Sequence, residues 1–215
     1  MKKIFIVFLF LSLSSTIYSQ KTATKKFQSA FKEVSISTMG LDNFILENSG
    51  TEFIEIILRA ENPNKQHIVV KEVNGETVIK FNIPTFKREE KIFRKYITKR
   101  LKRAAAILKI PKNTNVSIFG EEIHISSKSY HGNLRIFIEN GIVKLDTIQQ
   151  NLELKLYTGN VFATLKKTHV DVISNSGKIK IDGMLYHKKY QKTAISTPRE
   201  VSIITKKGNI FLTHR

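Results

Sequence analysis

A single glycine recurs at a fixed interval in the second half of the chain. Gly141, Gly159 and Gly177 are 18 residues apart both times. Around each of them, the residues seven and five positions before and two and four positions after are apolar, and the intervening residues are mostly polar. Such alternation is typical of strands with one buried side. The interval therefore predicts a repeating unit of strand, turn and strand.

The equivalent apolar positions define the side of each unit that we expect to be buried. A unit of 18 residues with two short strands cannot bury that side alone, whereas stacked units bury it in one continuous column. Glycine is expected at the corner because it adopts a positive φ at little cost. The same spacing also fits a meander of hairpins in a β-sandwich. The first column would contain Leu134, Leu152 and Val170, and the second Ile136, Leu154 and Val172.

A fourth copy of the pattern surrounds Gly208. Val201 and Ile203 precede this glycine by seven and five residues, and Ile210 and Leu212 follow it by two and four. Gly208 comes 31 residues after Gly177, which is one interval of 18 plus 13 further residues. We therefore expect the surplus to form a loop insertion within residues 184–200.

The first half of the chain also alternates, from Val34 onward. Asn74 and Gly75 stand between two apolar runs, and Asn-Gly is a strong signal for a β-hairpin because both residues tolerate positive φ. Pro84 ends this part, and Pro111 marks the end of a later strand at Ile110.

Residues 84–106 interrupt the alternation and are strongly basic. Their larger apolar residues recur every three to four positions, which predicts a short helix near residues 87–103. A basic amphipathic helix is typical of a surface that binds anionic lipid headgroups or polymers. The alternative is a helix that only caps the end of the stacked units. The candidate anion-binding residues are Lys87, Arg88, Lys91, Arg94, Lys95, Lys99, Arg100, Lys102 and Arg103.

The first residues are typical of a secretory signal peptide. Lys2 and Lys3 precede an apolar run that continues to Leu13, and small and polar residues follow. A bilayer span takes about 20 residues, so this run is too short, although an uncleaved anchor remains the alternative. We therefore assign residues 1–19 to a signal peptide and residues 20–215 to one domain. The protein is expected in the periplasm, at the cell surface or outside the cell.

Composition excludes several kinds of site. The chain has no cysteine, so disulfides, thiol catalysis and cysteine metal sites are excluded. Its six histidines form no close pair at ligand spacing, and no metal or cofactor is expected. The formal net charge of +18 favours anionic partners, although many lysines can also serve solubility alone.

The acidic residues of the repeats do not predict a catalytic pair. Asp146 and Asp182 occupy equivalent positions, with Thr164 between them, and stacking would place them about 9–10 Å apart. That distance is at the long limit for an inverting glycosidase, and no third acid accompanies them. Arg135 and Glu153 share another position and are expected to form an exposed pair contributing about 0.5 kcal/mol.

The segments ILKIPKNTNVSI and ISNSGKIKIDG resemble sequences of the putative-adhesin domains of bacterial exported proteins. The resemblance covers roughly residues 105–213 and, more weakly, residues 34–84. It implies an all-β fold that is a right-handed β-solenoid, and the glycine interval gives about 18 residues per coil. The predicted fold is therefore a single-stranded right-handed β-solenoid with coils of this length. It implies no catalytic residues, and the basic segment departs from the family's pattern. A fold of this kind does not by itself define a function.

These observations together predict an exported, non-enzymatic protein of the cell envelope or cell surface with a binding or scaffold role. The expected partners are an anionic envelope polymer or membrane headgroups, and export argues against nucleic acid. Two alternatives stay open. One is an enzyme acting on envelope polysaccharide, which would need several carboxylates in one groove, and the other is a purely structural assembly component. The sequence predicts neither the ligand nor the oligomeric state.

Overall fold

The alternating pattern produces an all-β protein. The computed structural model describes residues 21–83, 104–194 and 199–215. The first strands are β1 (Thr22–Gln28), β2 (Glu33–Ser37), β3 (Asn43–Asn48), β4 (Phe53–Arg59), β5 (Ile68–Val73), β6 (Glu76–Phe81) and β7 (Ala105–Ile110). The later strands are β8 (Asn115–Ser127), β9 (Leu134–Thr147), β10 (Leu152–Leu165), β11 (His169–Ser174), β12 (Ile179–Ile181), β13 (Met184–Tyr186), β14 (Lys189–Lys192) and β15 (Glu200–His214).

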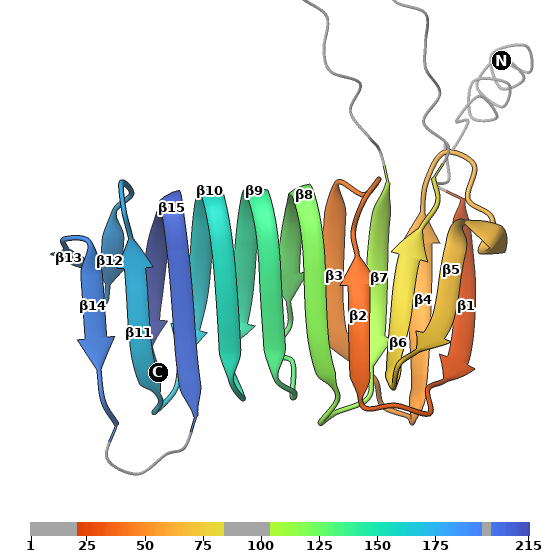
Figure 1. Ribbon diagram of the computed structural model, residues 1–215, viewed down its shortest axis with the longest axis horizontal. Helices are drawn as coiled ribbons and strands as arrows, with labels where there is room; N and C mark the ends of the chain where they lie inside the picture. Colours follow the sequence, from red (N-terminus) through yellow and green to blue (C-terminus); the bar gives the residue numbers. More distant parts are fainter. Residues whose placement is uncertain (1–20, 84–103, 195–198) are drawn as a thin grey trace, which may run out of the picture.

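The strands lie in two layers with the core between them, as Figure 1 shows. What we name the first face runs, in order of pairing, through β5, β6, β2, the first halves of β8, β9, β10 and β15, then β11 and β14. The second face runs through β1, β4, β7, β3, the second halves of the same long strands, then β12 and β13. Each long strand thus contributes to both faces. The arrangement is open and does not close into a barrel.

Neighbouring long strands are parallel and in register. Leu152 pairs with Leu134 and Gly159 with Gly141, so β10 lies beside β9 at an offset of 18 residues. Parallel pairing excludes the meander of hairpins, in which these strands would be antiparallel. A bulge between Ala163 and Thr164 shifts the register near the end of the pair.

The order of the last strands differs from the sequence order. β15 lies between β10 and β11, so Val201 separates Leu152 from Val170 in the column where these two were expected to be neighbours. The expected column was therefore wrong at this point. The physical reason is that β14 covers the outer edge of β11, which leaves the inner edge free for β15.

The insertion at residues 184–200 was predicted as a loop, but its described part contains two short strands. Asp182 and Gly183 both have positive φ, at 49° and 87°, and this two-residue turn folds β13 back onto β12. β14 pairs antiparallel with β11. The rings of Tyr186 and Tyr190 meet edge to face at 4.6 Å and pack against the core. The insertion thus covers one end of the apolar column.

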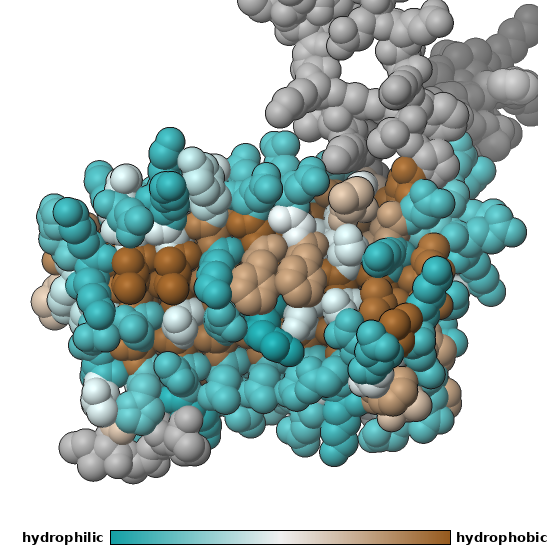
Figure 2. Space-filling model, viewed as in Figure 1, coloured by the Kyte–Doolittle hydropathy of each residue, from teal (hydrophilic) through white to brown (hydrophobic). Residues whose placement is uncertain are grey.

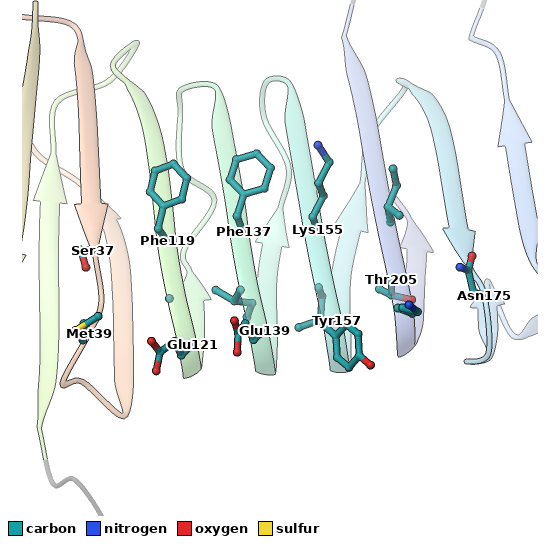
Figure 3. A pocket seen from close by; sticks show the side chains of 15 residues that line it. Ser37, Met39, Phe119, Glu121, Phe137, Glu139, Lys155, Tyr157, Asn175 and Thr205 are labelled. Carbon is teal, nitrogen blue, oxygen red and sulfur yellow. The ribbon is translucent and has the colours of Figure 1, made fainter. Parts of the chain in front are cut away.

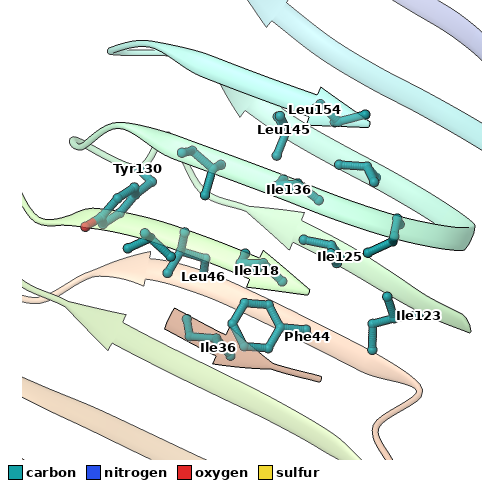
Figure 4. Close-up of a cluster of buried hydrophobic side chains, with 14 of the residues drawn as sticks. Ile36, Phe44, Leu46, Ile118, Ile123, Ile125, Tyr130, Ile136, Leu145 and Leu154 are labelled. Carbon is teal, nitrogen blue, oxygen red and sulfur yellow. The ribbon is translucent and has the colours of Figure 1, made fainter. Parts of the chain in front are cut away.

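The inward assignment of the repeat positions is confirmed. Every apolar side chain seven or five positions before, or two or four after, the four glycines is at most 7% exposed. Figure 4 shows how Ile118, Ile136 and Leu154 of the first face meet Ile125 and Leu145 of the second. Further buried residues in the N-terminal half continue this core, among them Ile36, Phe44, Leu46, Ile56, Leu58, Ile79 and Leu108.

The corner glycines are required for two different reasons. Gly141 and Gly159 have φ values of 152° and 129°, which side chains rarely adopt. A Cβ at Gly159 would also lie 1.9 Å from the carbonyl oxygen of Gly141. Gly177 was expected to have positive φ as well, but its φ lies outside that region, and it is required by contact alone: its Cβ would lie 2.0 Å from the oxygen of Gly208.

Two predictions about the N-terminal half are confirmed. β5 and β6 form the antiparallel hairpin, with Asn74 at φ 51° and Gly75 at φ 82° in its turn. β7 ends at Ile110, directly before Pro111.

The predicted signal peptide and the basic helix near 87–103 lie outside the described residues. Within the described ranges the one helical element is a short 3₁₀ turn, η1 (Lys65–His67), and no helix is long and apolar enough to cross a membrane. Residues 84–103 connect β6 to β7. β6 pairs with β2 on the first face and β7 with β3 on the second, so the described residues on either side of this segment lie on different faces.

Candidate functional site

An apolar stripe crosses the outer side of the first face. The outward positions in one register row are occupied by Phe119 of β8, Phe137 of β9, Lys155 of β10, Ile204 of β15 and Ile173 of β11. Figure 2 shows this stripe as a band of apolar side chains interrupted by one hydrophilic residue. Outward side chains do not contribute to the core, so folding alone does not require them to be apolar.

Two phenylalanines form the centre of the stripe. The ring centroids of Phe119 and Phe137 are 5.5 Å apart and their planes differ by 15°. Phe119 is 44% exposed, and Phe137 is half-buried. In Figure 3 both rings turn a face toward the viewer, away from the strands that carry them. The pair thus presents a flat aromatic surface to solvent.

A second row of outward side chains lies two residues further along the same strands. Between the two rows runs an open groove of about 690 Å³ (Figure 3). The backbone at Gly120, Ile138, Leu156 and Thr205 lines it between the rows. The side chains of the second row are Met39, Glu121, Glu139, Tyr157, Lys206 and Asn175.

The groove has an acidic end and a basic end. Glu121 and Glu139 line it on β8 and β9, whereas Lys155 and Lys206 line it on β10 and β15. The ammonium of Lys155 lies 5.1 Å from the ring centre of Phe137 and also pairs with Glu153 at 2.8 Å.

Tyr157 is the aromatic centre of the basic end. The ammonium groups of Lys206 and Lys207 lie 5.7 and 5.8 Å from its ring centre. Cations that gather around aromatic rings in this way form a surface suited to an anionic group attached to an apolar or ring-shaped body.

Glu121 and Glu139 bring two carboxylates into one groove, as the enzyme alternative requires. Both side chains are exposed. Glycoside hydrolysis by a carboxyl pair needs one carboxyl held protonated, usually by an apolar pocket, while the other stays ionised. The two glutamates have similar, solvated surroundings, so the groove is better suited to hydrogen-bonding a ligand than to acid–base catalysis.

Asp146 and Asp182 are too far apart to form a catalytic pair. Asp146 and Asp182 lie on β9 and directly after β12, with β10 and β15 between those strands, so strand spacing puts them about 14 Å apart. Asp182 accepts hydrogen bonds from the backbone and the imidazole of His214, and these bonds lower the pKa of its carboxyl group.

The predicted exposed pair of Arg135 and Glu153 does not form. The two residues are register neighbours, but Arg135 pairs with Glu33 at 3.4 Å, and Glu153 pairs with Lys155 at 2.8 Å. Lys155 lies two residues after Glu153 on the same side of β10, so Lys155 and not Arg135 pairs with the Glu153 carboxylate.

The groove was not predicted from the sequence, and the residues that were predicted to bind anions, Lys87 to Arg103, lie outside the described residues. Outward-facing aromatics are the signal that could have indicated the groove, since Phe119, Phe137 and Tyr157 occupy positions that the alternation assigns to solvent. In the described ranges, no group of three or more histidine, aspartate or glutamate side chains is arranged to hold a metal ion.

The fold is shared with a solved structure. The chain is similar to a putative cell adhesion protein from Clostridium sporogenes, with a TM-score of 0.59 and 13% identity, covering 92% of this chain and 100% of that one. A putative adhesin from Bacteroides fragilis matches with a TM-score of 0.33 and 11% identity, over 92% and 98% of the two chains. No protein-family model and no curated protein matches the sequence. The first likeness shows that this all-β fold occurs in another protein, and at this identity it shows the fold alone.

Proposed function

We propose that this chain is an exported, non-enzymatic binding protein of the cell envelope or cell surface, and that its repeats are coils of a right-handed β-solenoid. The parallel pairing of β9 and β10 at an offset of 18 residues supports the solenoid. The typical signal-peptide composition of residues 1–19 supports export. The fold shared with the Clostridium protein, described as a putative cell adhesion protein, is consistent with a binding role.

The observation that carries the proposal is the groove on the first face. It is lined by residues of β2, β8, β9, β10 and β15 and by Asn175, which directly follows β11, and at strand spacing this is a length of about 24 Å. An exposed apolar patch rimmed by charged residues is typical of an interaction site. A long open groove fits an extended polymer better than a compact small molecule, which would be enclosed on most sides.

The side chains of the groove favour an acidic polysaccharide as the polymer. The exposed ring faces of Phe119 and Phe137 can pack against the apolar face of a sugar ring. The carboxylates of Glu121 and Glu139 can accept hydrogen bonds from hydroxyl groups. Lys155 and Lys206 at the other end provide the positive charge for a uronate or another anionic substituent.

Loss of the aromatic surface tests this proposal. In a variant with Phe119→Ser and Phe137→Ser, the dissociation constant for oligogalacturonate, measured by calorimetry, should rise at least about tenfold, because aromatic anchors dominate such surfaces. The fold should be retained because both rings point outward. Phe53→Ser is the matched control: Phe53 is 40% exposed on β4, away from the groove, and its loss should leave the affinity unchanged. Equal affinities for the parent and the double variant would refute the groove as the site.

The basic segment provides a second, electrostatic contribution in this proposal. Replacing Lys91, Arg94, Lys95, Lys99, Arg100 and Lys102 with glutamine removes six charges. We expect the six-fold variant to bind the acidic polymer more weakly at low salt, and the affinity of the parent to fall as the Debye length shortens below about 10 Å. Pull-down on immobilised polygalacturonate at low and high salt is the measurement. If the variant binds like the parent at both salt concentrations, the segment takes no part in binding.

A further inference from the structure

A second aromatic surface lies on the outer side of the second face. Four consecutive strands, β9, β10, β15 and β12, carry Lys144, Phe162, Phe211 and Lys180 in one register row. We name this row the platform. It has a phenylalanine pair at its centre and one lysine at each end.

The two rings of the platform form a continuous apolar surface. The ring centroids of Phe162 and Phe211 are 4.9 Å apart and their planes differ by 10°. Phe162 is 38% exposed, and Phe211 is half-buried. Both side chains point away from the core, so folding does not require these two positions to be apolar.

Polar groups border the rings along the strands. On one side, the amide of Asn209 donates to the side-chain oxygen of Asn160 at 2.9 Å. On the other side, the hydroxyl groups of Thr164 and Thr213 are 3.4 Å apart. These groups lie two residues before and two residues after the phenylalanines, so a ligand that covers the rings also reaches amides and hydroxyls.

The platform is positively charged at both ends. Lys144 and Lys180 are exposed, and neither forms an ion pair with any residue of the described ranges. Asp146 and Asp182 each lie two residues after one of these lysines. The charge of Asp146 also attracts the ammonium group of Lys128, and Asp182 forms a hydrogen bond with His214. Three strand spacings separate the lysine backbones, which is about 14 Å.

We infer that the platform is a second binding site for an acidic glycan, so that one chain holds two polymer strands on opposite faces. The observation is the same constellation found in the groove, a phenylalanine pair on neighbouring strands with a lysine on the next strand. Two lysines about 14 Å apart suit the spaced charges of a linear acidic polymer and not one compact anion.

The position of the platform argues against a membrane as its partner. Residues that insert into a lipid surface combine protruding apolar groups with a basic rim. The platform instead lies within a sheet, on strands with neighbours on both sides, and is bordered by paired amides and hydroxyls. The inference goes beyond the proposed function, because a protein with two opposed sites cross-links polymer strands as well as binding them.

The stoichiometry of a short ligand tests the platform directly. Calorimetry with oligogalacturonate should give two sites per parent chain, and one site in a variant with Phe162→Ser and Phe211→Ser. A second variant, Lys144→Gln with Lys180→Gln, keeps the apolar surface and should weaken the second site at least about tenfold. Ile45→Ser is the matched control, since Ile45 lies in the same row on β3, beyond Ser126. It should retain two sites, and the thermal midpoint of each variant checks folding.

Cross-linking provides the functional measurement. Light scattering should rise when the parent is mixed with long polygalacturonate, and it should not rise with either platform variant, although both still bind through the groove. One site in the parent that both folded platform variants keep, or two sites in both folded platform variants, would overturn the inference. So would binding of anionic vesicles or an oligonucleotide at the platform in place of oligogalacturonate. If the parent has one site, which the groove variant keeps and the variant with Phe162→Ser and Phe211→Ser loses, the groove proposal fails and the platform remains a binding site.

Discussion

Gly159→Ala is expected to destabilise the protein by about 4 kcal/mol or more, which is enough to unfold most of a domain of this size. The new Cβ would lie 1.9 Å from the carbonyl oxygen of Gly141 on the neighbouring strand. That atom belongs to backbone held by pairing on both sides, so it cannot move without breaking the register of β9 and β10. The φ of 129° adds strain for any side chain.

Gly183→Ala separates the effect of positive φ from the effect of close backbone contact, which act together at Gly159. Gly183 also has positive φ, at 87°, but nothing lies within 4 Å of the position of its Cβ. Its substitution should therefore cost only the conformational strain, about 1–2 kcal/mol. Gly50→Ala, with free space and no positive φ, should be close to neutral. Urea denaturation of the three variants ranks them, and similar midpoints for Gly159→Ala and Gly183→Ala would contradict the role of close backbone approach.

Leu152→Asp is expected to have the other large effect, a loss of several kcal/mol, of the order of 4 kcal/mol. Leu152 is 2% exposed and lies between Leu134 and Val201 in the apolar column. A carboxylate at this position would have no partner and would be separated from water by strands on either side. Far-ultraviolet circular dichroism during chemical denaturation measures the effect.

Lys155→Asp is the matched control on the same strand. Lys155 points outward with 53% of its side chain exposed, so the substitution removes a solvated ion pair with Glu153 and an exposed contact with the Phe137 ring. Such pairs contribute about 0–1 kcal/mol, and the midpoint should move little. Equal midpoints for the two β10 variants would refute the assignment of inward and outward positions.

The local pattern of the sequence was sufficient to predict which residues are buried. Leu134, Leu152 and Val201 are buried because alternation fixes the direction of each side chain in a strand, and the glycine interval fixes where the chain turns. The hairpin at Asn74 was predictable for a similar reason, since its two residues supply the positive φ that the turn requires.

The order of the strands and the position of the groove were not predictable in this way. Equivalent spacing around Gly177 and Gly208 shows that the two segments are alike, but it does not determine which one pairs with β10, because that depends on the path of the insertion. The groove arises from Phe119, Phe137 and Tyr157, which are far apart in sequence and come together only through parallel register. A run of basic residues can be recognised within a short stretch of sequence, whereas the aromatic rows are formed by residues from several strands.

The position of β15 has a consequence for how the fold is completed. β15 comes last among the described strands in sequence, yet it pairs with β10 on one side and with β11 and β12 on the other. A nascent chain that ends before residue 200 therefore lacks the strand that joins its two portions, and it leaves facing edges with unpaired backbone groups. Contacts between distant segments also form slowly. Until this strand is made, a chain emerging from the ribosome therefore leaves these edges open to pairing with other chains.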